Sequence, residues 1–316
     1  MNKLITNISG INKLTKEAFE YLSEVSDINY VTISGQYELQ KSLSECDVFW
    51  FRLNHKLTDE VLKTAKCKFI LCAVTGLDHI DLEACKKNNI TIVSLKNEQE
   101  FLKEVRATVE HSFGLMLSLI RQNKVAFKHS EEYKWNRNLF QGEELYRKNI
   151  GILGFGRLGK IMADYAAAFG MKVFYFDKIE DRNTSFTRCN SINELISKVD
   201  FLSIHITFDS STQFIVNENV LKSIQQKLYI INTSRGGVVN EDDIIKYLKL
   251  GKIKGYATDV LYKEPDIQEN KLIAYAKEHT NVIITPHIGG FTKESIAKTE
   301  IFIARKFIQI LKKNKF

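Results

Sequence analysis

The sequence predicts an α/β protein with two parallel sheets, each covered by helices. Short apolar segments alternate with helix-like segments along most of the 316 residues, a rhythm typical of parallel sheets. In the middle of the chain, three glycines spaced G-x-G-x-x-G stand between a strand-like segment, Ile150–Leu153, and a helix-like one, Arg157–Phe169. A chain of this length can form two such domains, each with its own core.

The part of the chain before residue 99 is predicted to form the smaller domain. We expect strands at Leu4–Ile8, Ile28–Ile33, Val48–Phe51, Phe69–Val74 and Ile90–Val93, and helices at Thr15–Val25, Tyr37–Ser44, Thr58–Ala65 and Leu82–Lys87. No glycine signature for phosphate binding occurs in this part. We therefore interpret it as a flavodoxin-like domain that holds substrate.

Two places in this domain are candidate substrate contacts. Arg52 follows the strand Val48–Phe51, and the carboxyl end of a parallel strand is where α/β sheets bind ligands. Val74, Thr75 and Gly76 form a turn at the end of the next strand, which can present backbone N–H groups to a carboxylate. The alternative for Arg52 is a solvated surface arginine.

The glycine loop has the context of a dinucleotide-binding βαβ unit. Gly154 permits a tight turn, Gly156 lets the backbone approach a pyrophosphate, and Gly159 lets helix and strand pack closely. The helix N-terminus offers N–H groups to the phosphates. Asp177 ends the next strand, where its carboxylate can bind both ribose hydroxyls and would repel a 2′-phosphate. This pattern predicts a Rossmann domain that prefers NAD to NADP; the alternative is a glycine-rich turn without a ligand.

The larger domain is predicted to open with one long helix, Phe101–Arg121, followed by a polar and aromatic segment, residues 122–148, that fits neither core. We expect this segment to be an arm that wraps a second subunit. After Asp177, we expect strands at Phe201–Ile206, Leu228–Ile231, Gly255–Thr258 and Val282–Ile284, and helices at Ser191–Lys198, Asn217–Ile224 and Glu241–Leu250. A final helix, Thr292–Lys312, is expected to return to the first domain. The predicted domains are residues 1–99 with 290–316, which bind substrate, and residues 100–289, which bind NAD.

An arginine, a glutamate and a histidine each follow a predicted strand of the larger sheet. Arg235, Glu264 and His287 all lie beyond carboxyl ends of strands, where a nicotinamide would lie. Hydride transfer to a keto acid leaves charge on the carbonyl oxygen, and a histidine can supply a proton near neutral pH. A neighbouring carboxylate favours the protonated imidazole and orients the ring, and arginine binds carboxylates bidentately. Alone, each residue has a structural explanation; together they predict an oxidoreductase site.

Composition argues against several other classes of protein. No apolar run approaches the roughly 20 residues of a membrane helix, and no signal peptide is recognisable, so we expect a cytoplasmic protein without membrane contact. The five cysteines include no C-x-x-C pair, which favours reduced, buried thiols. The net charge of +7 is spread along the chain, so we predict no nucleic-acid partner; the sign suits an anionic substrate. The histidines are scattered, so no metal site is predicted.

Four ordered motifs resemble the D-isomer-specific 2-hydroxyacid dehydrogenase family, over nearly the whole chain. They are GFGRLG at 154–159, NTSRGGVVNEDDI at 232–244, DVLYKEP at 259–265 and TPHIGG at 285–290. The resemblance implies that Arg235 binds the substrate carboxylate, that His287 is the general acid/base, and that Glu264 is its paired acid. It also implies that Asp259 lies near the nicotinamide carboxamide, and that the protein is a homodimer built through the cofactor domain.

The resemblance completes the set of expected site residues. The catalytic residues are Arg235, Glu264 and His287; the cofactor-binding residues are Gly154, Gly156, Arg157, Leu158, Gly159, Asp177, Thr233, Asp259 and His287; and the substrate-binding residues are Arg52, Val74, Thr75, Gly76 and Arg235. Arg52 matches phosphoglycerate-type members of the family, whereas Cys72 stands where they often have arginine. The C-terminal regulatory domain of some of those members is not expected here.

We therefore expect an NAD-dependent enzyme that interconverts a D-2-hydroxy acid and its 2-keto acid. Its substrate is expected to be phosphoglycerate-like or hydroxypyruvate/glyoxylate-like. One alternative is a dinucleotide-sensing binding protein, like the related transcriptional corepressors. Another is a formate- or phosphonate-type dehydrogenase. Turnover of a keto acid with NADH separates the enzyme from the binding protein.

Overall fold

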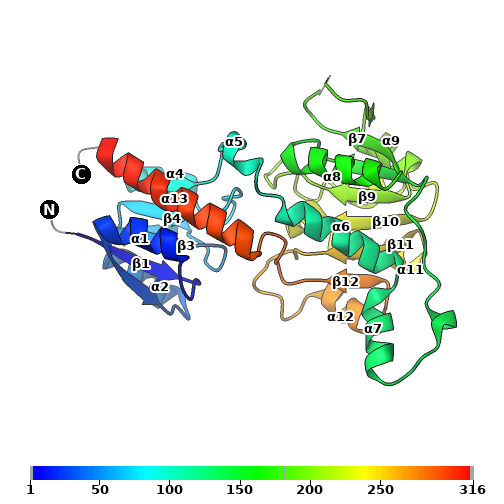
Figure 1. Cartoon of the computed structure of the whole chain (residues 1–316), viewed down its shortest axis with the longest axis horizontal. Coiled ribbons are helices and arrows are strands. Elements are labelled where there is room, and N and C mark those ends of the chain that lie inside the picture. The colour runs from blue at the N-terminus through cyan, green and yellow to red at the C-terminus, as the bar shows by residue number, and fades with distance from the viewer. Residues whose placement is uncertain (1–2, 181–182, 314–316) are drawn as a thin grey trace. The chain divides into compact units, whose positions relative to one another are not determined.

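The computed structural model describes residues 3–180 and 183–313, which form two compact units (Figure 1). Unit 1 comprises Met1–Val105 and Thr292–Phe316, and unit 2 comprises Arg106–Phe291. Each unit has its own parallel sheet and its own apolar core. The predicted fold class, α/β with two parallel sheets, is confirmed.

Unit 1 is built on a five-stranded sheet with the order β2-β1-β3-β4-β5. The strands are β1 (Leu4–Ser9), β2 (Ser26–Val31), β3 (Val48–Phe51), β4 (Phe69–Cys72) and β5 (Thr91–Ser94). Alternate side chains of β3 enter opposite faces of the sheet: Val48 and Trp50 join one core, and Phe49 and Phe51 join the other. All four side chains are fully buried, so this strand runs through the middle of the unit.

Helices cover both faces of this sheet. The helices α1 (Lys16–Val25) and α13 (Lys293–Lys313) lie over one face, and α2 (Gln36–Ser44), α3 (Asp59–Leu62) and α4 (Leu82–Lys87) lie over the other. From α13, Ile303, Phe307 and Leu311 recur at helical spacing and enter the same core as α1. The last helix of the chain is therefore part of unit 1 (Figure 1).

Unit 2 is built on a seven-stranded sheet with the order β12-β11-β10-β9-β6-β7-β8. The strands are β6 (Asn149–Leu153), β7 (Lys172–Phe176), β8 (Thr187–Arg188), β9 (Phe201–Ile204), β10 (Leu228–Asn232), β11 (Ile253–Thr258) and β12 (Val282–Ile284). One face is covered by α6 (Ala107–Ile120) and α8 (Arg157–Ala168), and the other by α9 (Ile192–Lys198), α10 (Glu218–Leu221), α11 (Glu241–Lys249) and α12 (Lys271–Glu278). The strand order reverses between β6 and β9, and such a reversal marks the edge where α/β sheets bind ligands.

The structure corrects several predicted elements. The prediction of a single helix at Phe101–Arg121 is wrong. Helix α5 (Gln99–Leu102) ends because the N–H groups of residues 103–105 donate to the carbonyls three residues earlier, as in a 3-10 turn, and the separate helix α6 begins at Ala107. The strand predicted at Phe69–Val74 stops at Cys72, because the N–H of Val74 turns back onto the Cys72 carbonyl at 2.8 Å. The arm at 122–148 contains α7 (Asn123–Glu131) and a short 3-10 helix, Arg137–Leu139.

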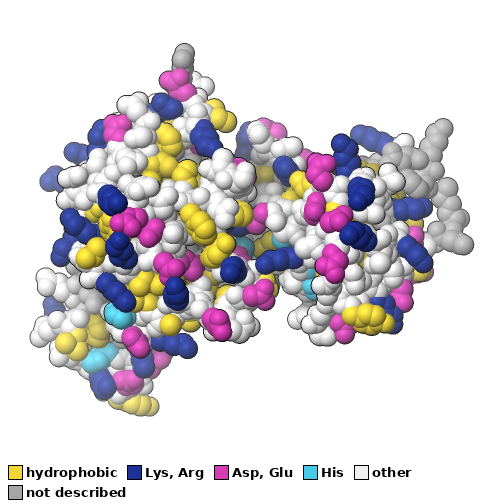
Figure 2. Space-filling view, turned by 180° about the vertical axis from the view of Figure 1, so that it is seen from behind, with side chains coloured by type: hydrophobic (Ala, Val, Ile, Leu, Met, Phe, Trp, Pro, Cys, Tyr) yellow, Lys and Arg dark blue, Asp and Glu magenta, His cyan; other side chains and the backbone are white. Residues whose placement is uncertain are grey.

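Four features of the described residues bear on the predictions made from composition. Within the described residues, no helix combines the length and apolar character that a membrane span requires. All five cysteines are free and buried. Basic and acidic side chains are interspersed over the face in Figure 2. Among residues 3–180 and 183–313, no group of His, Cys, Asp and Glu is placed to hold a metal ion.

Candidate active site

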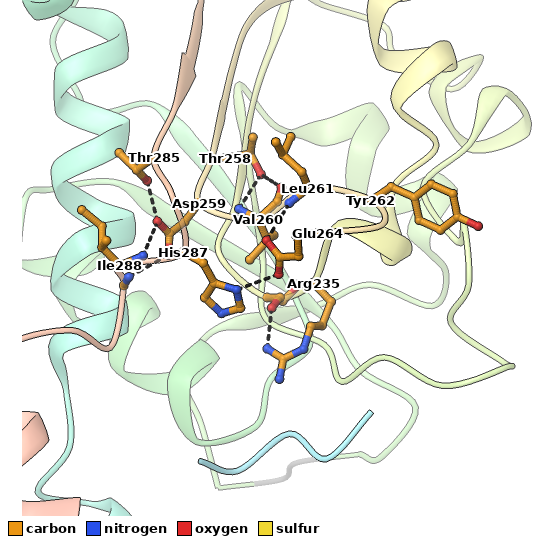
Figure 3. A network of polar contacts seen from close by, with 12 residues as sticks. Arg235, Thr258, Asp259, Val260, Leu261, Tyr262, Glu264, Thr285, His287 and Ile288 are labelled. Atoms are coloured by element: carbon orange, nitrogen blue, oxygen red, sulfur yellow. Dashed lines mark hydrogen bonds and ion pairs between the residues drawn. The ribbon is translucent and has the colours of Figure 1, made fainter. Parts of the chain in front are cut away.

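Strand register brings three loops of unit 2 to one edge of the sheet. Strands β10, β11 and β12 are adjacent and parallel, with Asn232 opposite Thr258 and Thr258 opposite Ile284. The segments that follow these strands therefore leave the sheet next to one another. They carry Arg235 after β10, Asp259 and Glu264 after β11, and Thr285 and His287 after β12 (Figure 3).

Glu264 and His287 form a close pair. Glu264 Oε1 lies 2.6 Å from His287 Nδ1, with the two side chains 30% and 26% exposed. Glu264 Oε2 also accepts a hydrogen bond from the N–H of Leu261 at 3.3 Å. The N–H of His287 donates to the carbonyls of Asp259 and Thr285 at 2.8 and 3.0 Å, which holds its backbone at a left-handed φ of 54°. Since Nδ1 faces the carboxylate, Nε2 is the nitrogen that can exchange a proton with a ligand.

Arg235 is positioned by the turn after β10. The buried Asn232 donates from Nδ2 to the Arg235 carbonyl at 3.0 Å, and its Oδ1 accepts the N–H of Ser234 at 3.1 Å. The next residue, Gly236, begins a short 3-10 helix, Gly236–Val238, and a Cβ there would collide with the backbone of Leu261. A glycine is therefore needed for this loop to approach the segment that carries Glu264. Figure 3 shows the Arg235 side chain in the same region as the Glu264–His287 pair.

Asp259 anchors the loop that carries His287. It is 1% exposed, and its carboxylate accepts hydrogen bonds from Thr285 Oγ1 at 2.5 Å and from the N–H groups of Ile288 and Gly289 at 2.9 and 2.7 Å. His111 Nε2, from α6, lies 3.2 Å from the same carboxylate. Burial alone would raise the pKa of Asp259, but the hydrogen bonds from His111, Thr285 and the two N–H groups bring it below its usual value. Asp259 is therefore ionised at neutral pH.

The glycine loop joins β6 to α8 where the strand order reverses. Gly154 has a φ of 91°, and a Cβ there would meet the His205 carbonyl at 2.7 Å. A Cβ on Gly159 would collide with the Gly154 carbonyl, so strand and helix need glycine to pack. A Cβ on Gly156, in contrast, would meet nothing within 4 Å. The loop is therefore open at Gly156, as an approaching phosphate at a helix N-terminus requires.

Asp177 follows β7 and binds the glycine loop. Its Oδ2 accepts the N–H of Phe155 at 2.6 Å, and its Oδ1 accepts the N–H of Ile179 at 2.8 Å. Each carboxylate oxygen has a second lone pair, so both can also accept a ribose hydroxyl. The other expected cofactor residues lie along the same edge, with Arg157 and Leu158 at the start of α8 and Thr233 after β10. Burial lowers the pKa of Arg157. Thr233 Oγ1 lies 2.6 Å from Ser112 Oγ.

The expected substrate residues of the smaller domain lie at the carboxyl edge of the unit 1 sheet. Arg52 follows β3, and its NH2 group lies 2.8 Å from Oε1 of Glu300, a fully buried residue of α13. Residues 74–76 follow β4, after the turn at Cys72. The structure thus places these residues in unit 1 and the Arg235, Glu264 and His287 cluster in unit 2.

The expected site residues do not include three members of these networks, namely His111, Thr285 and Glu300. His111 Nε2 lies 2.9 Å from Thr285 Oγ1 across 174 residues of chain, and no local pattern connects the two. For Glu300, the sequence does contain a signal that could have identified it as a buried acid. It stands one turn before Ile303 and Ala304 on the apolar side of the last helix, where an acid requires a partner.

These features define a class of protein: a two-unit α/β protein with a dinucleotide-binding loop and an Arg, Glu and His cluster at the carboxyl edge of the same sheet. Residues 113–289 match the family described as D-isomer specific 2-hydroxyacid dehydrogenase, NAD binding domain. The chain belongs to the D-isomer specific 2-hydroxyacid dehydrogenase family.

Comparison with known proteins finds similar chains over most of this sequence. The chain is 30% identical over 304 residues to the D-3-phosphoglycerate dehydrogenase of Methanocaldococcus jannaschii, which covers 95% of this chain and 56% of that protein. It is 30% identical over 302 residues to the hydroxypyruvate reductase of Thermotoga maritima, covering 94% of this chain and 96% of that one. The fold is similar to that of D-lactate dehydrogenase from Aquifex aeolicus complexed with NAD and lactic acid, with a TM-score of 0.82, 26% identity and coverage of 97% and 95%. The chain spans about half the length of the phosphoglycerate dehydrogenases that it matches.

Proposed function

We propose that the protein is an NAD-dependent oxidoreductase that interconverts a D-2-hydroxy acid and its 2-keto acid. The observation that carries the proposal is the 2.6 Å contact between Glu264 and His287, at the sheet edge that also carries Arg235. Family membership and the similarity to a hydroxypyruvate reductase and a D-lactate dehydrogenase support it. In this proposal residues 100–289 bind the dinucleotide, and residues 1–99 with 290–316 contribute substrate contacts through Arg52 and residues 74–76.

Residues of unit 2 can transfer the proton and bind the substrate carboxylate. Bound NADH would supply the hydride that reduces the carbonyl carbon of the keto acid. Protonated His287 gives the proton on Nε2 to the carbonyl oxygen as negative charge develops there. Glu264, on Nδ1, orients the ring and stabilises its positive charge. Arg235 binds the substrate carboxylate through two N–H groups, and in the reverse direction neutral His287 accepts the hydroxyl proton.

The proposed cofactor is NAD rather than NADP. Both oxygens of Asp177 can accept a ribose hydroxyl, while its negative charge disfavours a 2′-phosphate nearby. Gly156 leaves room for the pyrophosphate, and Gly154 and Gly159 let the strand, the turn and the helix pack closely beside it. The other proposed cofactor contacts are Arg157, Leu158, Thr233 and Asp259. The proposed compartment is the cytoplasm, which the free, buried cysteines support.

We also propose that the segment 122–148 mediates a homodimer. Its helix α7 has no buried residue. Phe127, Tyr133 and Trp135 are 63%, 100% and 94% exposed, although large aromatic side chains are usually buried in a core or at an interface. A second copy of the chain would remove this apolar surface from water, which favours association.

The proposed function is tested by a substrate panel. Pyruvate, glyoxylate, hydroxypyruvate and the 3-phosphate ester of hydroxypyruvate are each supplied with NADH, and the fall in NADH absorbance is followed. We expect at least one of these 2-keto acids to be reduced. Binding of NADH without reduction of any 2-keto acid would favour the dinucleotide-sensing alternative instead.

A further inference from the structure

Helix α6 places a second histidine, His111, against the loops that follow β11 and β12. His111 Nε2 lies 2.9 Å from Thr285 Oγ1 and 3.2 Å from Asp259 Oδ1. Thr285 follows β12 and Asp259 follows β11, and all three residues belong to unit 2. The His111 side chain is 22% exposed, so most of it is enclosed by this packing. His111 therefore links a helix of unit 2 to the ends of two neighbouring strands.

Both contacts require a hydrogen on Nε2 of His111. Thr285 Oγ1 donates its own hydrogen to Asp259 Oδ1 at 2.5 Å, so this oxygen can only accept from the histidine. The ionised carboxylate of Asp259 has no hydrogen to donate, so it too can only accept. The N–H at Nε2 of His111 is thus directed at two protein acceptors, whereas in His287 the nitrogen that faces a carboxylate is Nδ1. His111 is therefore placed to hold other residues rather than to exchange a proton with a ligand.

The residue that His111 holds, Asp259, in turn fixes the backbone around His287. The Asp259 carboxylate accepts the N–H groups of Ile288 and Gly289, and its carbonyl accepts the N–H of His287 (Figure 3). His287 has a left-handed φ of 54°, a conformation that a residue with a side chain adopts only when its surroundings impose it. The direction of the His287 ring therefore depends on where the Asp259 carboxylate lies.

We propose that His111 is a positioning residue for proton transfer: its Nε2–H holds Asp259 and Thr285, and through them the loop that directs His287 toward the ligand. The inference rests on the proposed function and adds a residue of α6 to its site. Without this donor, a carboxylate that is 1% exposed loses a hydrogen bond that water cannot readily replace, so the loop that it holds shifts. A shift of about 1 Å in a group that transfers a proton can cost about 10²-fold in rate.

The test compares three replacements of His111 that differ in where they carry an N–H donor. Glutamine places a donor near the position of Nε2, asparagine places one near the position of Nδ1, and leucine has none. The measured quantity is kcat for reduction of the best 2-keto acid of the panel, with NADH affinity measured by fluorescence on the same samples. We expect kcat to fall about 10- to 100-fold in His111→Leu and His111→Asn, but less than about five-fold in His111→Gln. NADH affinity should change less than kcat, and equal kcat values in the three variants would overturn the inference.

A His287→Gln background shows whether the effect passes through His287. In that background His111→Leu should lower kcat by less than about three-fold, because the ring that it positions is already absent. A general loss of packing would instead lower kcat by the same factor in both backgrounds, and that result would overturn the inference. The matched control is Glu110→Gln, at the exposed neighbouring position of α6, which should retain the wild-type kcat. A loss there as large as in His111→Leu would also overturn it.

A measurement on the wild type keeps the inference testable where a variant does not fold. The ¹⁵N spectrum of histidine-labelled protein, with the His111 signals assigned from their loss in a His111 variant, reports which ring nitrogen carries hydrogen. We expect Nε2 of His111 to be protonated at neutral pH, and an unprotonated Nε2 would overturn this inference alone. A wild type that reduces no 2-keto acid would overturn the proposed function, and the part of His111 in proton transfer with it.

Discussion

Replacing Glu264 with glutamine tests whether this carboxylate acts through His287. Glutamine has nearly the same size and can still bond Nδ1, but it removes the negative charge opposite the imidazolium. The 2.6 Å contact is charge-assisted when His287 is protonated, and such hydrogen bonds contribute about 1.5–3 kcal/mol. That range corresponds to a loss in kcat for keto-acid reduction of about 10- to 150-fold. Because the Glu264 and His287 side chains are both more than one quarter exposed, solvent screens their charges. We therefore expect a loss of kcat in the lower part of this range, about 10- to 40-fold.

The assay is steady-state NADH oxidation with saturating keto acid, with NADH binding measured separately by fluorescence. We expect the Glu264→Gln protein to bind NADH as the wild type does, because the charge is needed when the proton is transferred.

A double-variant cycle is the control for this prediction. In a His287→Gln background the Glu264→Gln change should have no further effect on kcat, because the partner is already absent. An equal loss in both backgrounds would mean that Glu264 acts independently of His287, and the pairing would be wrong as a catalytic assignment.

Three further predictions concern the cofactor, the subunit arrangement and acid stability. Asp177→Ala should narrow or erase the preference for NADH over NADPH in kcat/KM, and a wild type that prefers NADPH would refute the role of Asp177. Combined Tyr133→Ser and Trp135→Ser changes should shift the protein toward monomer in light scattering at micromolar concentration; a wild type that is already monomeric contradicts the dimer. Burial lowers the pKa of His205 from 6.5 to about 4, so its neutral form stabilises the fold above pH 6.5 and this stability is lost as pH falls toward 4. The loss amounts to as much as roughly 3 kcal/mol. Denaturant unfolding of His205→Gln should show a shallower decline over that pH range, and an unchanged slope would count against the assignment.

The features that the sequence predicts correctly have local causes. The G-x-G-x-x-G spacing with its flanking strand and helix predicts the loop between β6 and α8, where Gly154 and Gly159 have no room for a side chain. The motif order places Arg235, Glu264 and His287 after strands, and the register of β10, β11 and β12 brings those strand ends together.

The features that the sequence does not predict depend on tertiary contacts. The break between α5 and α6 is hidden because apolar spacing continues through it. The Arg52–Glu300 pair joins residues 248 positions apart, and only the packing of α13 into the unit 1 core makes the two meet. The Asp259 network likewise depends on α6, which brings His111 to the end of β11.

The central claim is that His287 transfers the proton when NADH reduces a 2-keto acid. The most direct measurement compares kcat for the best substrate of the panel in the wild type and in His287→Ala, with NADH affinity measured on the same samples. His279→Gln, which alters a histidine at the C-terminal end of α12, is the control. We predict that His287→Ala loses about 10²- to 10⁴-fold in kcat while still binding NADH, and that His279→Gln retains wild-type kcat. A His287→Ala protein that turns over substrate at the wild-type rate would contradict the account.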